Sequence, residues 1–250
     1  MDSFSYFRRK SILSTMKILL VGYGKMGKTI EGIATARGHE IAGRIDIDNH
    51  DDLNTVEADV AIEFSHPDAA YENVRKCIER NIPVVCGTTG WLARKSDIEK
   101  LTNEKGGTFF YASNYSLGVN LFFKLNEYLA RMINGFPSYD VSIDEIHHTQ
   151  KKDAPSGTAI TLAEGILKHV DRKSRWVEAP ASNAEELGIQ SFRIDDIPGT
   201  HLVKYQSAID DIEIKHTAHT REGFALGAVM VAEWVPGKKG ILNMDDFLKF

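Results

Sequence analysis

The stretch KILLVGYGKMGKTIEGIATARGHEIAGRID, residues 17–46, decides the fold class of this chain. Its apolar run at residues 18–21 predicts a buried strand, which a glycine turn, a helix ending near Ala36 and a second strand at residues 40–45 follow. Strands joined through a helix lie parallel in one sheet, because a parallel connection needs a dozen or more residues. The sequence therefore predicts an α/β protein whose folded part begins near Met16.

Glycines in G-x-G-x-x-G spacing occupy the turn after the first strand, at Gly22, Gly24 and Gly27. Gly22 permits the tight turn, Gly24 lets backbone amides approach a pyrophosphate, and Gly27 lets the helix lie close to the strand. Lys25 and Met26 stand between the last two glycines and are predicted to contact the same ligand. The turn and the helix N-terminus predict a Rossmann dinucleotide-binding domain, with a purely structural turn as the alternative.

An acidic residue stands where such a domain binds the adenosine ribose. Asp46 follows Gly27 by 46 − 27 = 19 residues, close to the roughly 20 expected for this carboxylate. The next residues, Ile47 and Asp48, offer no cation for a 2′-phosphate, and strand alternation turns Arg44 to the face opposite its neighbour. The sequence therefore predicts NADH as the preferred cofactor, with NADPH as the alternative.

Three further segments extend the predicted parallel sheet, at residues 60–64, within residues 82–87 and at residues 108–112. Ligands of an open parallel sheet bind beyond the carboxyl ends of its strands, so the residues after each strand are predicted to line the cofactor site. The alternatives are that the GTTG segment is only a tight loop and that the tyrosine after the last strand packs in the core. The predicted contacts are Phe64, Ser65, Gly87, Thr88, Thr89, Ser113, Asn114 and Tyr115.

The composition of the 250 residues bounds the class of protein. With 42% hydrophobic residues the chain can bury one large or two modest cores, and a net charge of −5 predicts no broad basic surface for nucleic acid. Cys77 and Cys86 are too few for a disulfide framework, which favours a reducing, cytoplasmic setting. No apolar run approaches the roughly 20 residues that span a membrane. Residues 1–15 are expected to be a flexible extension, with a targeting peptide as the alternative.

The pattern changes in the second half of the chain. A helix is predicted at residues 121–133, and one of its faces is expected to be buried because it carries large apolar side chains, as in an ordinary core-facing helix. These side chains are Leu121, Leu125, Tyr128, Leu129 and Met132. The following segment SYDVSIDEIHH, residues 138–148, alternates apolar and polar residues and predicts a strand with at least one solvated face.

The segment HHTQKKDAPSGTA, residues 147–159, overlaps the end of that strand. Pro155 fixes the backbone and Ser156 is a candidate N-cap, so a helix is predicted to begin at the glycine that follows. The first amides of a helix have no partner inside it and are therefore predicted to bind an anion. They belong to Gly157, Thr158 and Ala159.

Cationic and titratable side chains stand beside this predicted anion site. Lys151 supplies a fixed positive charge, and His147 or His148 can give or take a proton near neutral pH. No metal site is expected, because adjacent histidines at a strand end point to opposite sides and no cysteine or second histidine pair stands at ligand spacing. Lys152 fits a solvated loop. The set predicts a small carboxylate-bearing substrate that changes protonation when it reacts.

Taken together, the motifs resemble those of the dihydrodipicolinate reductase family, also called 4-hydroxy-tetrahydrodipicolinate reductases, of the bacterial diaminopimelate and lysine pathway. The resemblance runs from about Lys17 to the C-terminus. In the family's order it includes GYGKMG, EFSHPDA, GTTGW, SNYSLGVN, the histidine segment, GTH at residues 199–201 and KHTAHTREGFALGAVMVAEW. Several independent motifs in one order are far more specific than any one of them.

The resemblance implies roles for individual residues. His147 matches the family's proposed proton donor or acceptor, His148 a substrate-binding histidine, and Lys151 a lysine proposed to bind a substrate carboxylate or assist proton transfer. The turn that would hold a carboxylate is Ser156, Gly157 and Thr158. The implied reaction is hydride transfer from NAD(P)H to a ring carbon of the substrate, with a proton supplied to the resulting enamine.

The resemblance also implies an architecture. A dinucleotide-binding domain would comprise residues 16–118 and 222–250, with an α+β substrate-binding domain, residues 119–221, inserted between them. The mixed sheet of the inserted domain would form a homotetramer. The implied partners are therefore a small dicarboxylate substrate and further copies of the chain, with no nucleic acid and no membrane.

Three features depart from the family's pattern. The glycine turn is one residue tighter than the usual G-x-x-G-x-x-G, Tyr115 stands where phenylalanine is usual, and the segment between Asp46 and Ala58 is short. No basic residue follows the ribose-binding acid, which agrees with a preference for NADH.

Two other functions fit parts of the sequence. A non-catalytic NADH-binding sensor would share the glycine turn, but it would not need the histidine, the lysine and the SGT turn. An aspartate or homoserine dehydrogenase would share a two-domain frame, but the double histidine and the DAPSGT element are not features associated with those families.

Overall fold

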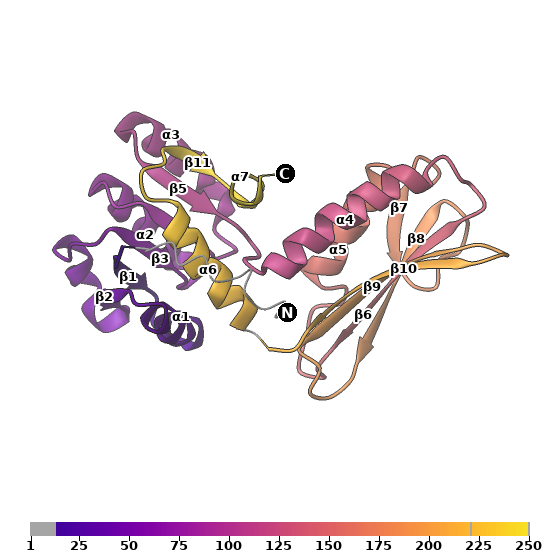
Figure 1. Cartoon of the computed structure of the whole chain (residues 1–250), viewed down its shortest axis with the longest axis horizontal. Coiled ribbons are helices and arrows are strands. Elements are labelled where there is room, and N and C mark those ends of the chain that lie inside the picture. The colour runs from indigo at the N-terminus through magenta and orange to yellow at the C-terminus, as the bar shows by residue number, and fades with distance from the viewer. Residues whose placement is uncertain (1–13, 221, 250) are drawn as a thin grey trace, which may run out of the picture. The chain divides into compact units, whose positions relative to one another are not determined.

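The computed structural model describes residues 14–220 and 222–249 (Figure 1). The expected extension at residues 1–15 lies almost wholly outside the described residues. The chain divides into two compact units, one running to Tyr115 and resuming at Phe224, the other spanning Ser116–Gly223. Each unit has its own sheet, and the predicted α/β class is confirmed.

A parallel sheet forms the centre of the first unit, and its described strands run in the order β11-β5-β4-β3-β1-β2. The strands are β1 (Lys17–Val21), β2 (Glu40–Ile45), β3 (Val60–Glu63), β4 (Val84–Cys86), β5 (Thr108–Tyr111) and β11 (Gly240–Leu242). Because β1 pairs with β2 on one side and with β3 on the other, the strand order reverses there. This is the point at which doubly wound sheets bind ligands, so the predicted Rossmann fold is confirmed.

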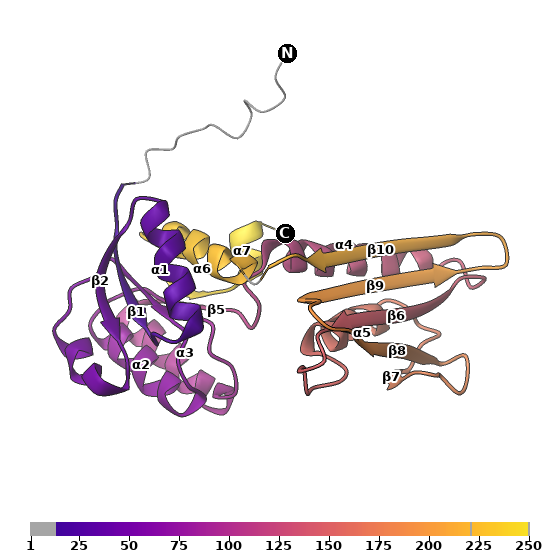
Figure 2. The same ribbon diagram turned by 90° about the horizontal axis from the view of Figure 1, so that it is seen from below.

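Helices cover both faces of this sheet (Figure 2). On one face lie α1 (Lys25–Ala36) and α6 (Glu222–Trp234), and on the other α2 (Pro67–Glu79) and α3 (Lys95–Lys105). The shorter helices of the unit are η2 (Ile47–Asn54), η3 (Leu92–Arg94) and α7 (Met244–Leu248). Covered on both faces, β3 and β4 are buried along their whole length, which explains their continuous apolar runs. Both cysteines are buried and free, as expected.

The turn between β1 and α1 needs glycine for steric reasons. Gly22 adopts φ = +93°, and a Cβ placed on it would lie 2.1 Å from the Phe64 carbonyl oxygen. A Cβ on Gly27 would lie 2.3 Å from the Gly22 carbonyl oxygen, because α1 packs directly on the turn. A Cβ on Gly24 would meet nothing within 4 Å. The first and third glycines therefore serve packing, and open space adjoins the second.

The second unit is built on a mixed sheet whose described strands run in the order β10-β9-β6-β8-β7. The strands are β6 (Asp140–His147), β7 (Arg175–Glu178), β8 (Glu186–Arg193), β9 (Gly199–Gln206) and β10 (Asp211–Ala218). The pairs β6–β8 and β7–β8 are parallel, whereas β6–β9 and β9–β10 are antiparallel. The helices α4 (Leu117–Ile133) and α5 (Gly157–Leu167) pack on one face of this sheet through the unit's hydrophobic core.

Strand β6 alternates between the two faces of this sheet, as predicted. Val141 and Ile143 are buried under the helices, whereas Ser142 and Asp144 are half-buried on the opposite face. The alternation places Glu145 on the core face, beside apolar residues. A fully buried carboxylate at that place requires polar partners inside the unit.

The predicted core face of the helix at residues 121–133 is wrong. The core instead receives Val119, Phe122, Asn126, Ala130 and Ile133, and the Asn126 amide donates to the Leu162 carbonyl at 3.0 Å. The expected core residues Leu121, Leu125, Tyr128 and Met132 are 50–61% exposed. The error arose because α4 carries large apolar side chains on two faces, so periodicity alone does not select one of them.

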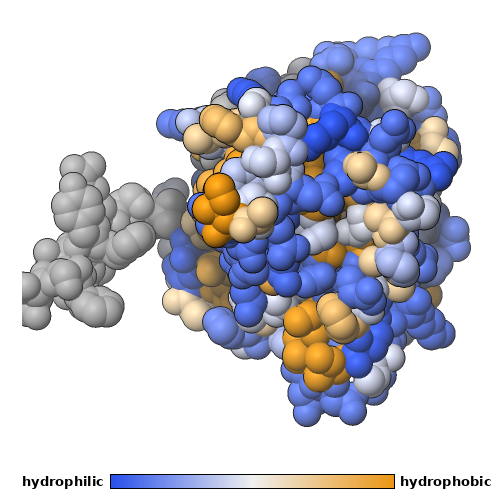
Figure 3. Space-filling model, turned by 90° about the vertical axis from the view of Figure 1, so that its right-hand side faces the viewer, coloured by the Kyte–Doolittle hydropathy of each residue, from blue (hydrophilic) through white to orange (hydrophobic). Residues whose placement is uncertain are grey.

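Apolar side chains also reach the surface elsewhere. In the view of Figure 3 they gather in separate small patches among hydrophilic residues rather than in one continuous surface. Within the described ranges, no helix has the length and apolar character needed to cross a bilayer.

Two glycines of α1 offer a matched test of the packing at the turn. Gly27→Ala should lower the free energy of unfolding by about 1–3 kcal/mol, because its Cβ would collide with backbone. Gly32→Ala should raise it by about 0.5–1 kcal/mol, because a Cβ there meets nothing within 4 Å and alanine is the better helix former. Urea unfolding measures both changes, and a destabilisation by the two variants alike would contradict the assignment.

Candidate active site

Helix α5 begins at Gly157, as the sequence predicts, and Ser156 is its N-cap. The Ser156 hydroxyl accepts from the Ala159 amide at 3.2 Å, and the Ser156 amide donates to Glu145 Oε2 at 3.0 Å. The cap therefore removes Ala159 from the predicted set of anion-binding amides, which corrects that expectation. The amides of Gly157 and Thr158 remain, and a Cβ on Gly157 would meet nothing within 4 Å.

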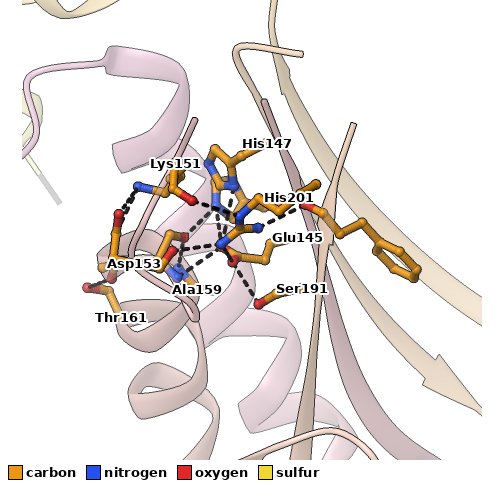
Figure 4. Close-up of polar contacts among 12 residues, drawn as sticks. Glu145, His147, Lys151, Asp153, Ala159, Thr161, Ser191 and His201 are labelled. Atoms are coloured by element: carbon orange, nitrogen blue, oxygen red, sulfur yellow. Dashed lines mark hydrogen bonds and ion pairs between the residues drawn. The ribbon is translucent and has the colours of Figure 1, made fainter. Parts of the chain in front are cut away.

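Glu145 lies fully buried at the centre of a group of polar side chains (Figure 4). Its Oε1 accepts from Ser191 Oγ at 2.8 Å and from Arg193 Nη2 at 3.2 Å. Burial raises the pKa of Glu145, but hydrogen bonds from Ser156 and Ser191 outweigh it and hold the pKa below its usual value. The carboxylate is therefore ionised at neutral pH, and its charge is balanced inside the unit.

Two histidine rings lie against the other oxygen of this carboxylate. Glu145 Oε2 is 3.5 Å from His147 Nδ1 and 3.8 Å from His201 Nε2, and the rings meet edge to face with centroids 5.1 Å apart. Burial lowers the pKa of His201 to about 3. Burial also lowers the pKa of His147, where Glu145 opposes this effect and Lys151 and Arg193 reinforce it. Both imidazoles are therefore neutral at neutral pH.

Arg193 ties the loop between β6 and α5 to the sheet. Besides Glu145, its guanidinium donates to the Asp153 carbonyl at 2.6 Å and to the Lys151 carbonyl at 3.3 Å. A planar guanidinium has several N–H donors and can donate hydrogen bonds to a carboxylate and two carbonyls at once, which an ammonium group does less well. The backbone position of Lys151 is thus set by a residue on β8.

Lys151 is paired rather than free. Its Nζ lies 2.9 and 2.8 Å from the two carboxylate oxygens of Asp153, and this pairing lowers the pKa of Asp153. The Asp153 side chain is 59% exposed, and a pair so open to water contributes little to stability. Breaking the ion pair between this lysine and Asp153 therefore has a small cost.

His148 faces a different environment from His147. It lines a cavity of about 290 Å³ formed by residues 148–150 and 195–198. Asp195 and Asp196 line this cavity, and its lining contains no lysine or arginine, so it does not suit a dicarboxylate. The structure thus groups His147, Lys151 and the SGT turn around Glu145 and Arg193, and it leaves His148 outside this group.

The ligand atoms of Glu145, His147 and His201 lie within 4.8 Å of one another, which is the spacing of a metal site. The carboxylate, however, already accepts hydrogen bonds from Ser156 and Ser191, and the Arg193 guanidinium is 3.2 Å away. A cation so close to a second cation is disfavoured. The donor set therefore does not suit a divalent metal ion.

In the first unit, the loops after β3 and β4 meet at Glu63, which is fully buried. Its carboxylate accepts from Thr88 Oγ1 at 3.1 Å, from Cys86 Sγ at 3.0 Å and from the Ser65 amide at 3.2 Å. The Ser65 hydroxyl also donates to it. Ser65 and Thr88, which are predicted cofactor contacts, are thus held side by side by a residue outside the predicted set.

Phe64 and Tyr115 pack against each other in the same unit, with ring centroids 5.4 Å apart. A Cβ on Gly87 would lie 2.2 Å from the Phe64 ring. Tyr115 is 1% exposed, and its hydroxyl donates to the Cys86 carbonyl at 2.7 Å. This side chain therefore packs in the core of the unit. Of the remaining predicted contacts on these loops, Thr89 and Ser113 are exposed and Asn114 is half-buried.

Asp46 is exposed after β2 and caps η2, the helix formed by the short segment that follows. Its carboxylate accepts from the Ile47 amide at 2.9 Å. Arg44 interacts with other residues than Asp46, because its Nε donates to Glu31 at 3.0 Å and its guanidinium lies over the Tyr23 ring. This arginine lowers the pKa of Glu31 to about 2. At the start of α1, Lys25 is exposed and Met26 is half-buried.

Sequence reasoning missed the residues that organise the second unit's polar group, namely Glu145, Ser191, Arg193 and His201. One signal was available, since the alternation of β6 places a glutamate on the same face as Val141 and Ile143. The other three residues come from β8 and β9, and only strand pairing brings them to this place.

Family models for dihydrodipicolinate reductase match nearly the whole chain, the N-terminal model over residues 16–115 and the C-terminal model over residues 118–248. The 4-hydroxy-tetrahydrodipicolinate reductase of Christiangramia forsetii is 50% identical over 235 residues, covering 93% of this chain and 98% of its own. The enzyme of that name from Archaeoglobus fulgidus is 34% identical over 253 residues, covering 90% and 96%.

Solved structures show the same fold. A dipicolinate-bound dihydrodipicolinate reductase from Paenisporosarcina sp. TG-14 matches with a TM-score of 0.76 at 22% identity, covering 94% of this chain and 99% of that one. A probable dehydrogenase from Thermotoga maritima matches with a TM-score of 0.54 at 10% identity, covering 92% of each chain. The models and the relatives together show that the chain belongs to the dihydrodipicolinate reductase family of NAD(P)H-dependent oxidoreductases.

Proposed function

We propose that this chain reduces 4-hydroxy-tetrahydrodipicolinate to tetrahydrodipicolinate in the diaminopimelate and lysine pathway, with His147 as proton donor and NADH as preferred hydride donor. The observation that carries this proposal is the grouping of a buried histidine, Lys151 and two unbonded helix amides around one loop. Such a group can hold a carboxylate and deliver a proton beside it.

The first unit is proposed as the dinucleotide-binding domain. The space beside Gly24 and the N-terminus of α1 fit a pyrophosphate, and Lys25 and Met26 begin that helix. Asp46 would accept hydrogen bonds from the ribose hydroxyls, and Ser65 and Thr88 would contact the nicotinamide end. The bound nicotinamide would supply the hydride.

The second unit is proposed as the substrate-binding domain. The amides of Gly157 and Thr158 and the ammonium of Lys151 would bind a substrate carboxylate, which displaces Asp153. Dipicolinate, the ligand named in the Paenisporosarcina structure, is a dicarboxylate and supports this class of substrate. The remaining parts of the proposal are a homotetramer built on the mixed sheet, a cytoplasmic location and a substrate contact by His148, although this histidine lines a separate cavity.

The cofactor preference can be measured directly. Because Asp46 would repel a 2′-phosphate and Arg44 is held by Glu31, kcat/KM should be about tenfold or more higher for NADH than for NADPH, which corresponds to about 1.4 kcal/mol. The assay follows loss of cofactor absorbance while the preceding synthase generates substrate from pyruvate and aspartate semialdehyde. Asp46→Ser should narrow the ratio, and equal use of both cofactors by the unmodified chain would refute the preference.

The role of His147 has its own test. His147→Gln should lower kcat/KM by about 10²–10⁴-fold, because a general acid is lost, while NADH affinity measured by fluorescence stays the same. His169→Gln is the matched control in the same unit, because that histidine lies beyond the end of α5 and outside the polar group. Retained turnover in His147→Gln, or a collapse of its NADH affinity, would show that the assigned role is wrong.

A further inference from the structure

We propose that Glu145 and Arg193 are a pair of positioning residues that set the tautomer, the charge and the place of the proton donor His147. Arg193 fixes the loop that carries Lys151, and Glu145 fixes the imidazole and the start of α5. This inference rests on the proposed role of His147, and the experiment below separates the failure of one from the failure of the other.

The two carboxylate oxygens of Glu145 have different tasks. Oε1 is taken by Ser191 and Arg193, which fix the orientation of the carboxylate and balance its charge. Oε2 faces the Ser156 amide at 3.0 Å and His147 Nδ1 at 3.5 Å. A single buried group therefore holds both the N-cap of the anion-binding helix and the histidine ring.

This arrangement selects the tautomer of the histidine. His147 Nδ1 is buried, makes no hydrogen bond in this structure and lies 3.5 Å from the Glu145 carboxylate. An ionised carboxylate only accepts hydrogen bonds, so the charge of Glu145 favours the tautomer with its hydrogen on Nδ1. The second nitrogen, Nε2, is then the one that exchanges a proton. A Cβ on Gly199 would lie 3.1 Å from this Nε2, so the absence of a side chain there keeps space beside it.

The proton transfer balances on this geometry. The step starts from the imidazolium form of His147, whose Nε2 has taken a proton from water. The Nε2–H bond breaks and its electron pair stays on the nitrogen, while the C=C π pair of the reduced substrate's enamine forms the new C–H bond. The enamine nitrogen's lone pair forms the C=N bond, and the proton on that nitrogen leaves to water. The imidazole returns to its neutral form with one hydrogen on Nδ1, directed to Glu145. Glu145 itself neither gains nor loses a proton in this step.

The charges around His147 act on its proton in opposite directions. The titratable and charged groups that face it come from β6, β8, β9 and the loop before α5. They are Glu145, Arg193, His201, Lys151 and Asp153, and His216 on β10 acts in turn on His201. Glu145 raises the pKa of His147 against the effect of burial, whereas Arg193 and Lys151 lower it.

Opposite charges predict opposite shifts of the pH–rate profile. A proton donor must be protonated to act, so kcat/KM falls as pH rises through its pKa. This falling part of the pH–rate profile is its basic limb. Glu145→Gln removes the stronger of the two carboxylates that raise the pKa of His147 and leaves only Asp153 against the two cations, so it should move this limb to lower pH by at least about half a unit. Arg193→Gln removes one of the two cations that lower the pKa of His147 and should move the limb to higher pH by a similar amount. Loss of packing alone cannot move one limb in two directions.

Two more variants separate charge from geometry. Arg193→Lys keeps the positive charge but loses the guanidinium hydrogen bonds to the Lys151 and Asp153 carbonyls. We therefore expect kcat to fall while the basic limb stays at the same pH. The double variant Glu145→Gln with Arg193→Gln leaves no unpaired buried charge, so it should be more stable than Arg193→Gln alone. The basic limb of the double variant should lie at nearly the same pH as that of the unmodified chain, because the opposite shifts of the two single variants cancel.

The same sheet contains a matched control. Glu186 is 3% exposed, accepts from the Ser182 amide and hydroxyl at 2.8 Å each, and pairs with Arg175 at 2.6 Å. This pair lies at the opposite end of β8 from Arg193. Glu186→Gln and Arg175→Gln should lower thermal stability without moving the pH limb.

The experiment measures kcat/KM against pH, KM for NADH and thermal stability for all of these variants and for His147→Gln. We expect opposite limb shifts with KM for NADH unchanged. If His147→Gln keeps the limb, the proposed proton donor is wrong and the inference falls with it. If His147→Gln abolishes the limb, but Glu145→Gln and Arg193→Gln leave it in place or move it the same way, the inference is overturned and the proposed function stands.

Discussion

The buried pairing of Glu145 with Arg193 is the constraint on which the second unit's polar group depends. A carboxylate on the core face of β6 is unstable there unless donors surround it, and a serine hydroxyl, a guanidinium and a backbone amide supply them. Meeting that requirement joins β6 to β8, holds the N-cap of α5 and orders the loop between β6 and α5. The site is thus a consequence of how the unit accommodates one buried charge.

The first unit solves a similar problem without a guanidinium. Glu63 is also fully buried at the end of a strand, and its partners are a threonine hydroxyl, a thiol, and the amide and hydroxyl of Ser65. The thiol belongs to the last residue of β4, and the other partners belong to the loops that follow β3 and β4, so the carboxylate holds the two loops together. In each unit a buried carboxylate at a strand end orders the loops beside it.

The parts of this fold that were predictable from the sequence are those fixed by local rules. The glycine turn, the N-cap at Ser156 and the alternation of β6 depend on neighbouring residues, and the structure contains all three. The buried face of α4 was not predictable, because that helix has two apolar faces and the partner decides between them. Arg193 reaches Glu145 through the register of β6 with β8, which pairs His147 with Arg193, and no local pattern encodes that register.

Two ion pairs beside the loop between β6 and α5 differ in their exposure to water. The pair of Glu145 and Arg193 is closed to water on the carboxylate side, so breaking it leaves a buried charge at a cost of several kcal/mol. The pair of Lys151 and Asp153 is open to water, and its loss costs little. The buried pair therefore holds the loop in place more strongly than the exposed pair does. Burial, rather than the kind of charged residue, decides how much each ion pair contributes to the order of the loop.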